Sequence, residues 1–219
     1  MAIEQVTLKL DIGKGATFVV LVEQGQDQAL LAQLRAQLEP SARLIVLELV
    51  FAASSNWRAV TERVLTELKN LRVRQATFIG LRDAAVIAQN VALQSLRSVR
   101  KLILLDPPTS PHPSLRERMV SWLESKLPLG LPLRLGNSHF DSRSLLHRMR
   151  CPVLAVMSAT GTDYHRVQAE QLVAGLPTVW FVELEPQQVV TGFAPLVMEF
   201  EKVQAKCPQK NRRVARYAS

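Results

Sequence analysis

The sequence predicts an α/β fold with a doubly wound, mostly parallel sheet and a small helical insertion. Two observations support this prediction: strand-like and helix-like segments alternate along nearly the whole chain, and several strand-like segments are apolar throughout. Strands that are apolar on both faces are typical of parallel sheets covered by helices on both sides. Their alternation with helices implies right-handed crossover connections.

The first half of the chain supplies most of the predicted elements. Residues 6–12 alternate apolar and polar side chains, as a half-exposed edge strand does, whereas residues 17–22 (TFVVLV) form a continuous apolar run. Asn56 or Ser55 is positioned to cap a helix. In this half the expected strands are residues 6–12, 17–22, 43–50, 76–79 and 101–105, and the expected helices are residues 28–38, 57–68 and 83–96.

The alternation stops between residues 109 and 150 and then resumes. This segment is rich in proline and contains one predicted helix, residues 115–126, so we interpret it as an insertion. After it we expect strands at residues 152–158 and 178–184 and helices at residues 167–174 and 195–205. The prediction is therefore a single domain over residues 1–205, with an insertion at about 109–150.

Composition narrows the class of protein. The 219 residues are 47% hydrophobic and 21% charged, which is typical of globular proteins. No apolar run approaches the roughly 20 residues of a membrane-spanning helix, and the first residues lack a signal peptide's apolar block. We therefore expect a cytoplasmic location. Cys151 and Cys207 have neither the spacing nor the neighbours of a disulfide framework or a metal cluster, so no cofactor or metal is expected.

The net charge of +8 is concentrated at the carboxyl terminus. Five basic residues lie in residues 206–219, and no acidic residue follows Glu201. We interpret these residues as a flexible, solvated tail. Nucleic acid or a membrane surface remains possible as a partner of the tail, although no aromatic side chains accompany it.

Ligands of such sheets bind beyond the carboxyl ends of the strands. The segment at residues 76–92 (ATFIGLRDAAVIAQNVA) is the most informative of these strand exits. A short strand leads through Gly80 into an alanine-rich helix. The resulting sequence over residues 80–84 is GLRDA, with Arg82 at its centre.

This junction resembles the nucleophile turn of the α/β-hydrolase superfamily, which reads G-x-S-x-G. Further segments resemble the same family in the same order. VVLVEQGQ is similar to the strand before the oxyanion loop, KLILLDPP to the strand after the nucleophile helix, LLHRMRCPVLAVMSATGTD to the segment before the acidic triad member, and VWFVELEPQQVVTGFAPLVMEFEKV to the last strand, histidine loop and helix. The resemblance covers about residues 6–205 and implies a shortened α/β-hydrolase fold.

Transferred residue by residue, the resemblance implies a degenerate catalytic site. Arg82 stands at the position of the serine, and Gln188 at that of the histidine. Gln24 falls in the oxyanion loop, and Asp163 could match the acid. Arginine stays protonated and only donates hydrogen bonds, and glutamine cannot shuttle a proton. The expected protein is a pseudoenzyme that has lost the covalent chemistry of the family.

Arg82 then has two possible roles. With the amino terminus of the following helix it could bind a carboxylate or phosphate. Alternatively it could pair with Asp83, Asp106 or Asp163 and plug the old pocket. The candidate ligand-binding residues are Gln24, Arg82, Asp83, Asp106, Asp163 and Gln188.

Other readings remain open. A relocated triad could use Ser54, Ser55 or Ser158 with His165, and an atypical hydrolase or lyase could use Glu23, Asp106 or Asp163 as a base. Asp106, which precedes two prolines, is more often a turn-capping residue. His112, His139 and His147 lack metal-ligand spacing. A protein partner could bind Met119, Trp122 and Leu123 of the insertion, and a homodimer is possible.

Overall fold

The computed structural model describes residues 5–50, 56–108, 142–158, 163–203 and 213–216, with the side chains of residues 163–165 and 213–216 left out. The predicted helix at residues 115–126, with the partner patch around Trp122, lies outside these residues, as do Ser54, Ser55, His112 and His139. Every other element that the sequence predicts is present, with boundaries shifted by a few residues at most except at the last helix.

Eight strands of the described chain form one sheet, in the order β1-β3-β2-β4-β5-β6-β7-β8. Only β1 is antiparallel to its neighbour; the other pairs are parallel, which confirms the predicted doubly wound, mostly parallel sheet. The strands are β1 (Gln5–Ile12), β2 (Ala16–Glu23), β3 (Ala42–Val50), β4 (Ala76–Leu81), β5 (Val99–Leu105), β6 (Val153–Ser158), β7 (Val179–Leu184) and β8 (Arg213–Arg216).

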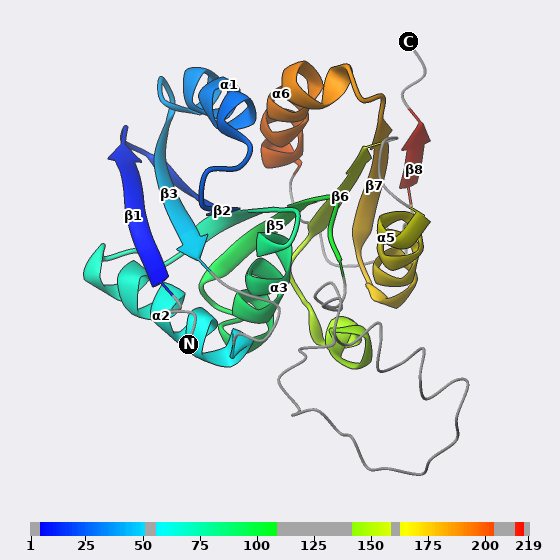
Figure 1. Ribbon diagram of the computed structural model, residues 1–219, viewed down its shortest axis with the longest axis horizontal. Helices are drawn as coiled ribbons and strands as arrows, with labels where there is room; N and C mark the ends of the chain where they lie inside the picture. The colour runs from blue at the N-terminus through cyan, green and yellow to red at the C-terminus, as the bar shows by residue number, and fades with distance from the viewer. Residues whose placement is uncertain (1–4, 51–55, 109–141, 159–162, 204–212, 217–219) are drawn as a thin grey trace.

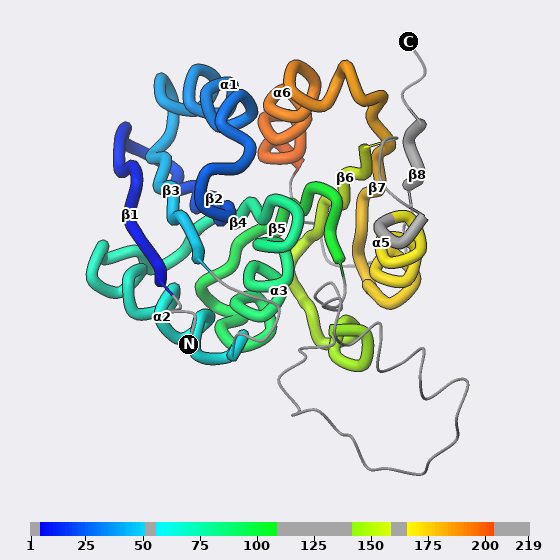
Figure 2. The backbone as a smooth tube through the Cα atoms, viewed as in Figure 1, coloured from blue at the N-terminus to red at the C-terminus, as the bar shows by residue number. Residues whose placement is uncertain are grey.

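Helices cover both faces of this sheet (Figures 1 and 2). One face carries α2 (Trp57–Asn70), α3 (Ala84–Gln94) and α5 (Asp163–Gly175), and the other carries α1 (Gln28–Leu38) and α6 (Gln188–Lys202), which lie side by side. A short 3₁₀ helix, η1 (Arg143–Arg148), precedes β6. Alternate residues of each central strand enter opposite core layers: Val19 and Leu21 pack with α2 and α3, and Val20 packs with α1 and α6.

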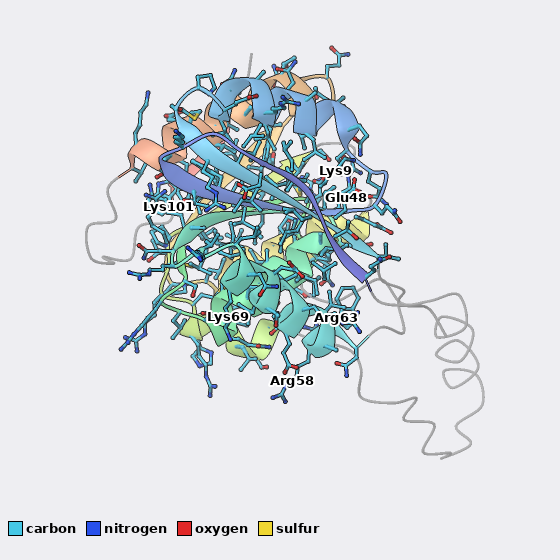
Figure 3. All side chains as sticks on the ribbon, turned by 90° about the vertical axis from the view of Figure 1, so that its left-hand side faces the viewer. Lys9, Glu48, Arg58, Arg63, Lys69 and Lys101 are labelled. Atoms are coloured by element: carbon cyan, nitrogen blue, oxygen red, sulfur yellow. The ribbon has the colours of Figure 1, made fainter. Side chains whose placement is uncertain are left out.

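The edge strand β1 is the most exposed of the described strands. Its pairing with β3 shifts register between Leu8 and Leu10, which leaves Lys9 at an irregular position. The Lys9 ammonium forms an ion pair with Glu48 (Figure 3). Bulges and lysines on an edge strand discourage pairing with a second sheet, so β1 is a poor edge for a homodimer.

Helix α2 has the ends that its sequence predicts. The Asn56 side chain caps the helix by accepting a hydrogen bond from the Ala59 N–H (3.2 Å). At the other end Arg72, with φ +56°, donates its N–H to the Lys69 carbonyl, and the Val73 N–H bonds the Leu68 carbonyl. These two bonds form a Schellman motif, in which the left-handed position is usually glycine.

The last predicted helix is wrong at its start. We expected it to begin at Pro195, but α6 begins at Gln188 and contains Pro195 in its interior. An interior proline costs a helix about 3 kcal/mol. Phe193, Val197 and Phe200 form a buried stripe along α6, and burial of each such side chain returns about 1.5–3 kcal/mol, which offsets that cost.

The basic tail also differs from the expected solvated terminus. Its residues Arg213–Arg216 form β8, which pairs in parallel with β7 through Trp180 to Glu183. Alternation in RVAR is too short to distinguish a strand from a frayed end by sequence alone. The parallel strands define two edges of the sheet. We name the edge where β2, β4, β5, β6 and β7 end the carboxyl edge, and the edge where they begin the amino edge.

Candidate functional site

The turn from β4 to α3 brings strand and helix unusually close together. A Cβ atom on Gly80 would lie 2.6 Å from the Cα of Ala85 and 2.8 Å from the Cβ of Ala88. Real Cβ atoms do not approach that closely, so only glycine fits. Ala84, at the last position of the turn, is fully buried against the same contact. The small residues of GLRDA therefore have a packing role that the sequence alone shows only as a pattern.

Arg82 occupies the apex of this turn with a left-handed backbone, φ +50°. Its N–H donates to the Leu105 carbonyl (2.8 Å), and its carbonyl accepts from the Ala85 N–H (2.9 Å). A left-handed conformation costs a residue other than glycine about 1–2 kcal/mol. The turn holds the Arg82 side chain outward, where it is 51% exposed. The predicted strained turn is thus present, with an arginine at its apex.

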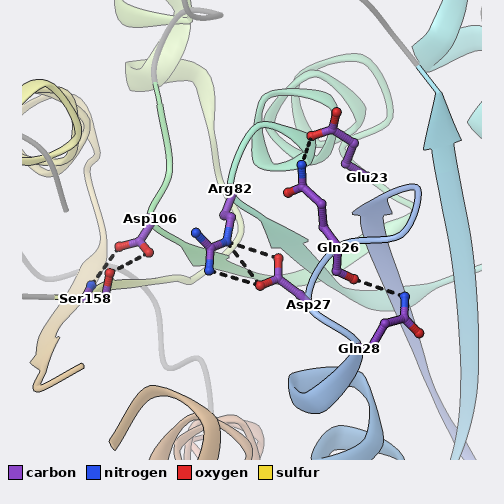
Figure 4. A network of polar contacts seen from close by, with 7 residues as sticks. All are labelled: Glu23, Gln26, Asp27, Gln28, Arg82, Asp106 and Ser158. Carbon is purple, nitrogen blue, oxygen red and sulfur yellow. Dashed lines mark hydrogen bonds and ion pairs between the residues drawn. The ribbon is translucent and has the colours of Figure 1, made fainter. Parts of the chain in front are cut away.

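The partner of Arg82 is an acid that the sequence analysis missed. Its Nε lies 3.1 Å from each carboxylate oxygen of Asp27, and its Nη2 lies 3.1 Å from Oδ1 (Figure 4). Among the described side chains the predicted partners Asp83 and Asp106 do not bond it, and the Asp163 side chain lies outside them. Because Arg82 is half exposed, it does not plug a buried pocket.

Asp27 is held in place by the turn that follows β2. It precedes α1, has φ +52°, and its backbone carbonyl accepts from the Leu31 N–H (2.9 Å). Its side chain is only 10% exposed. After this strand the sequence had indicated only Glu23 and Gln24 as candidates, and not the acid at position 27. The missed signal was an acid immediately before a predicted helix, which is a common capping position.

Two further carboxylates lie beside this ion pair. Burial raises the pKa of Glu23, the negative charges of Asp83 and Asp27 raise it further, and a hydrogen bond from Gln26 Nε2 (2.6 Å) opposes them. Within the described chain Asp83 has a buried Oδ1 without a hydrogen-bond partner. The surroundings of Arg82 are therefore rich in negative charge.

Asp106 connects the exits of β5 and β6. It is 6% exposed, with φ +46°. Its Oδ1 accepts from the Ser158 N–H and its Oδ2 from the Ser158 hydroxyl, both at 2.7 Å (Figure 4). The side chain therefore joins two strand exits, whereas its position before two prolines had suggested a local turn cap. Asp106 is thus the described partner of the Ser158 hydroxyl, and this contact joins the two strand exits.

The remaining predicted residues also lie at the carboxyl edge but do not join Arg82. Gln24 is exposed, and its N–H donates to the Leu49 carbonyl (3.0 Å). Gln188 is the first residue of α6, with its N–H bonded to Glu185 (2.8 Å), and it therefore does not lie in the expected loop. Asp163 is the first residue of α5. Neither Gln24 nor Gln188 bonds Arg82 through its side chain within the described chain.

Other reactive groups give no second centre among the residues described. His147 is exposed in η1, and the His165 side chain lies outside the described part of the chain. No group of three or more His, Cys, Asp or Glu side chains in that part is arranged to hold a metal ion. Burial raises the pKa of the Cys151 thiol to about 11, which keeps it protonated and unreactive. None of the described helices is long and apolar enough to cross a membrane.

Comparisons with known proteins agree with this architecture. No protein-family model matches the sequence, and neither does any curated protein. Solved structures do match. An enol-lactonase from Burkholderia xenovorans LB400 superposes with a TM-score of 0.64 at 16% identity, over 91% of this chain and 96% of that one. A hydrolase from Pseudomonas aeruginosa PA01 gives 0.63 at 17% identity, over 91% and 94%.

A third structure, MGS-MChE2, is an α/β-hydrolase enzyme from a lagoon-sediment metagenome in Morocco. It gives a TM-score of 0.67 at 14% identity, over 92% of this chain and 96% of that one. Identities this low establish the architecture and leave the chemistry to the residues at the site. Each superposition covers nearly the whole length of the matched structure. The protein has the α/β-hydrolase fold.

Proposed function

We propose that this protein is a non-catalytic member of its fold class, which acts by binding at the carboxyl edge. The supporting observation is the Arg82–Asp27 ion pair at the apex of the turn. A nucleophile at this apex must lose a proton to a neighbouring base. A guanidinium cannot do so at physiological pH, and the Arg82 guanidinium is already bonded to Asp27.

The negative charge around Arg82 affects which kind of ligand could bind there. A small anion would have to share Arg82 with Asp27, beside the carboxylates of Glu23 and Asp83. Like charges at this distance oppose such binding. A partner protein that presents a basic group or hydrogen-bond donors fits the same surroundings better. We therefore favour a protein partner over the small anionic ligand that Arg82 alone suggested.

One observation favours a second candidate, an atypical hydrolase. Glu23 has a raised pKa, and a carboxylate with a raised pKa at a strand exit is a reasonable general base. In that case Glu23 would activate a water molecule, and Arg82 would stabilise the developing negative charge.

Ester hydrolysis distinguishes the two candidates. We expect the full chain to hydrolyse p-nitrophenyl acetate and butyrate no faster than heat-inactivated protein, and Arg82→Ala to change nothing. An activity above background that falls at least about tenfold in Glu23→Gln, but not in the exposed control Arg35→Ala, would establish the atypical hydrolase instead.

A thermal-shift series tests the choice of ligand. We expect inorganic phosphate to leave the melting temperature of the wild type unchanged once ionic strength is matched. Asp27→Asn, which frees the guanidinium, should gain a phosphate-dependent stabilisation. A phosphate-dependent shift in the wild type that Arg82→Ala removes would instead show that the small anion is the ligand.

A further inference from the structure

The amino edge carries an array of arginines on three adjacent loops. The loops before β4, β5 and β6 contain Arg72 and Arg74, Arg97, and Arg148 and Arg150, respectively. These strands are neighbours in the sheet. The Ala76 N–H bonds the Ser98 carbonyl (2.9 Å), and the Leu102 N–H bonds the Pro152 carbonyl (3.0 Å), which places the three loop ends side by side. All five arginines are exposed.

Three other cations of the same edge, unlike these five, are engaged in internal contacts. Arg43 is paired with Asp11 and bonded to the Leu71 carbonyl, and Arg100 is paired with Glu201. Lys101 donates to the carbonyls of Phe200 and Glu201. Within the described chain the five arginines of the array form no ion pair and no side-chain hydrogen bond. Their side chains neither complete a structural network nor cap the helix ends that lie at this edge.

The local sequence offers little counter-charge for them. Residues 67–105 contain two acids, Glu67 in the last turn of α2 and Asp83 at the opposite edge; residues 142–152 contain none. The nearby acids Asp11 and Glu201 are already paired. Arg72 is held at the left-handed position of the Schellman motif, φ +56°, where glycine would be less strained. The array therefore presents a net positive charge toward solvent.

An apolar side chain projects from the middle of this array. Ser95 to Ser98 forms a tight turn, in which the Ser98 N–H bonds the Ser95 carbonyl (3.0 Å) and the two hydroxyls are 2.7 Å apart. Leu96 and Arg97 occupy the tip of the turn. Leu96 is 49% exposed. Among the described residues it is one of three exposed large hydrophobic side chains, together with Leu8 and Val167. Exposed leucine is unfavourable against a nucleic-acid backbone and favourable at the interface of a bilayer.

We propose that the amino edge docks on an anionic membrane surface, with the five arginines on lipid phosphates and Leu96 entering the interface. Guanidinium groups bind phosphate with paired hydrogen bonds. Several basic residues together with one apolar anchor give reversible peripheral binding without a spanning helix. This inference concerns the edge opposite Arg82 and does not depend on the proposed function.

Vesicle co-sedimentation of the full chain tests the proposal. The vesicles are phosphatidylcholine alone, or with roughly 30% phosphatidylglycerol, which gives an anionic surface. We expect binding only to the anionic vesicles. Arg74→Glu with Arg97→Glu should weaken it at least roughly 30-fold, and Leu96→Ser by about fivefold. Arg72→Gly should weaken it without loss of stability, because glycine suits that position.

The matched control reverses the same number of charges elsewhere. Arg58 and Arg166 are exposed and paired with Glu62 and Glu170 near the starts of α2 and α5. Arg58 lies near the start of α2 and Lys69 near its end, and both are labelled in Figure 3. Arg58→Glu with Arg166→Glu should keep most of the binding. Equal loss in this control, equal binding to neutral vesicles, or binding to a short nucleic-acid duplex but not to vesicles would overturn the proposal.

Discussion

The two edges of the sheet satisfy their charges in different ways. At the carboxyl edge acids predominate. Arg82 is paired with Asp27, Asp106 is bonded twice to Ser158, and Glu23 is partly buried beside other carboxylates. At the amino edge arginines predominate, and five of them are exposed without a partner in the described chain. Helices begin at the first edge and end at the second, so helix dipoles alone favour this distribution of charge.

The difference separates residues that maintain the fold from residues free to bind. The carboxyl edge, where enzymes of this architecture place their chemistry, holds most of its polar groups in internal contacts. The amino edge holds Arg43, Arg100 and Lys101 in internal contacts and leaves the five arginines of the array in solvent. The variants below change one edge at a time.

The largest effect is expected at the turn of the carboxyl edge. Gly80→Ala would place a Cβ 2.6 Å from the Ala85 backbone, which cannot move without displacing α3. We expect a loss of about 3 kcal/mol or more in the free energy of unfolding, measured in urea. Gly192→Ala is the control: its Cβ would meet only ordinary contacts of 3.7 Å or more, and helix propensity predicts no loss. If Gly80→Ala were as stable as Gly192→Ala, the close contact between β4 and α3 would be contradicted.

The next largest loss of stability is expected on substitution of Asp106. Asp106→Ala leaves the buried N–H and hydroxyl of Ser158 without the carboxylate oxygens they now bond at 2.7 Å. We expect about 2–3 kcal/mol of destabilisation by urea unfolding. Ser158→Ala, which removes one donor, should cost about 1 kcal/mol. If Asp106→Ala left the free energy of unfolding unchanged, the contact between the ends of β5 and β6 would not contribute to stability.

Lys101 is the corresponding anchor of the amino edge. Lys101→Met keeps the length of the side chain but removes the donor to the carbonyls of Phe200 and Glu201 at the end of α6. We expect a loss of about 1–2 kcal/mol by thermal or urea unfolding. The exposed Lys69→Met should change stability by less than about 0.5 kcal/mol. Similar losses in both variants would contradict a special role for Lys101.

The smallest expected effect concerns how stability depends on pH. The contributions of Glu23 and Asp11 should change with pH in opposite directions. The pKa of Glu23 is raised on folding, so its contribution to stability is present below its unfolded pKa and is lost as pH rises through the folded value. Arg43 lowers the pKa of Asp11, so the contribution of Asp11 is present above its unfolded pKa and is lost as pH falls through the folded value. The two edges should therefore respond in opposite directions.

Urea unfolding at pH 4 and pH 7 measures this difference. Glu23→Gln should be more stable than the wild type at pH 7 and similar to it at pH 4. Asp11→Asn should be less stable at pH 7. Both effects should stay under about 1 kcal/mol, because solvent screens these partly exposed groups. If both substitutions changed the free energy of unfolding at pH 7 in the same direction, the proposed difference between the two edges would be wrong.

The sequence predicted the central sheet well because its signals are local. Apolar runs identify β2 and β3, and the leucine spacing and Pro40 define the limits of α1. The start of α6 was wrong because proline usually marks a first turn, and only the tertiary burial of Phe193 shows that the helix begins earlier. Strand β8 depends on pairing with the distant β7, which no local pattern reveals.

At the site the sequence predicted the turn and the residue at its apex but not that residue's partner. Arg82 and Asp27 are separated by 55 positions and meet only because β2 and β4 are neighbours. Pairings of this kind depend on strand order, which the pattern of elements does not fix. The arginine array at the amino edge was missed for the same reason, since its members are dispersed over three loops.

The most direct test of the central claim is a search for an activated serine. The intact full chain is incubated with a fluorophosphonate, which forms a covalent adduct with the nucleophile of serine hydrolases, and its mass is then measured. We predict no adduct at a concentration that fully labels an active esterase. A stoichiometric adduct mapped to one serine, and lost when that serine is replaced by alanine, would contradict the account.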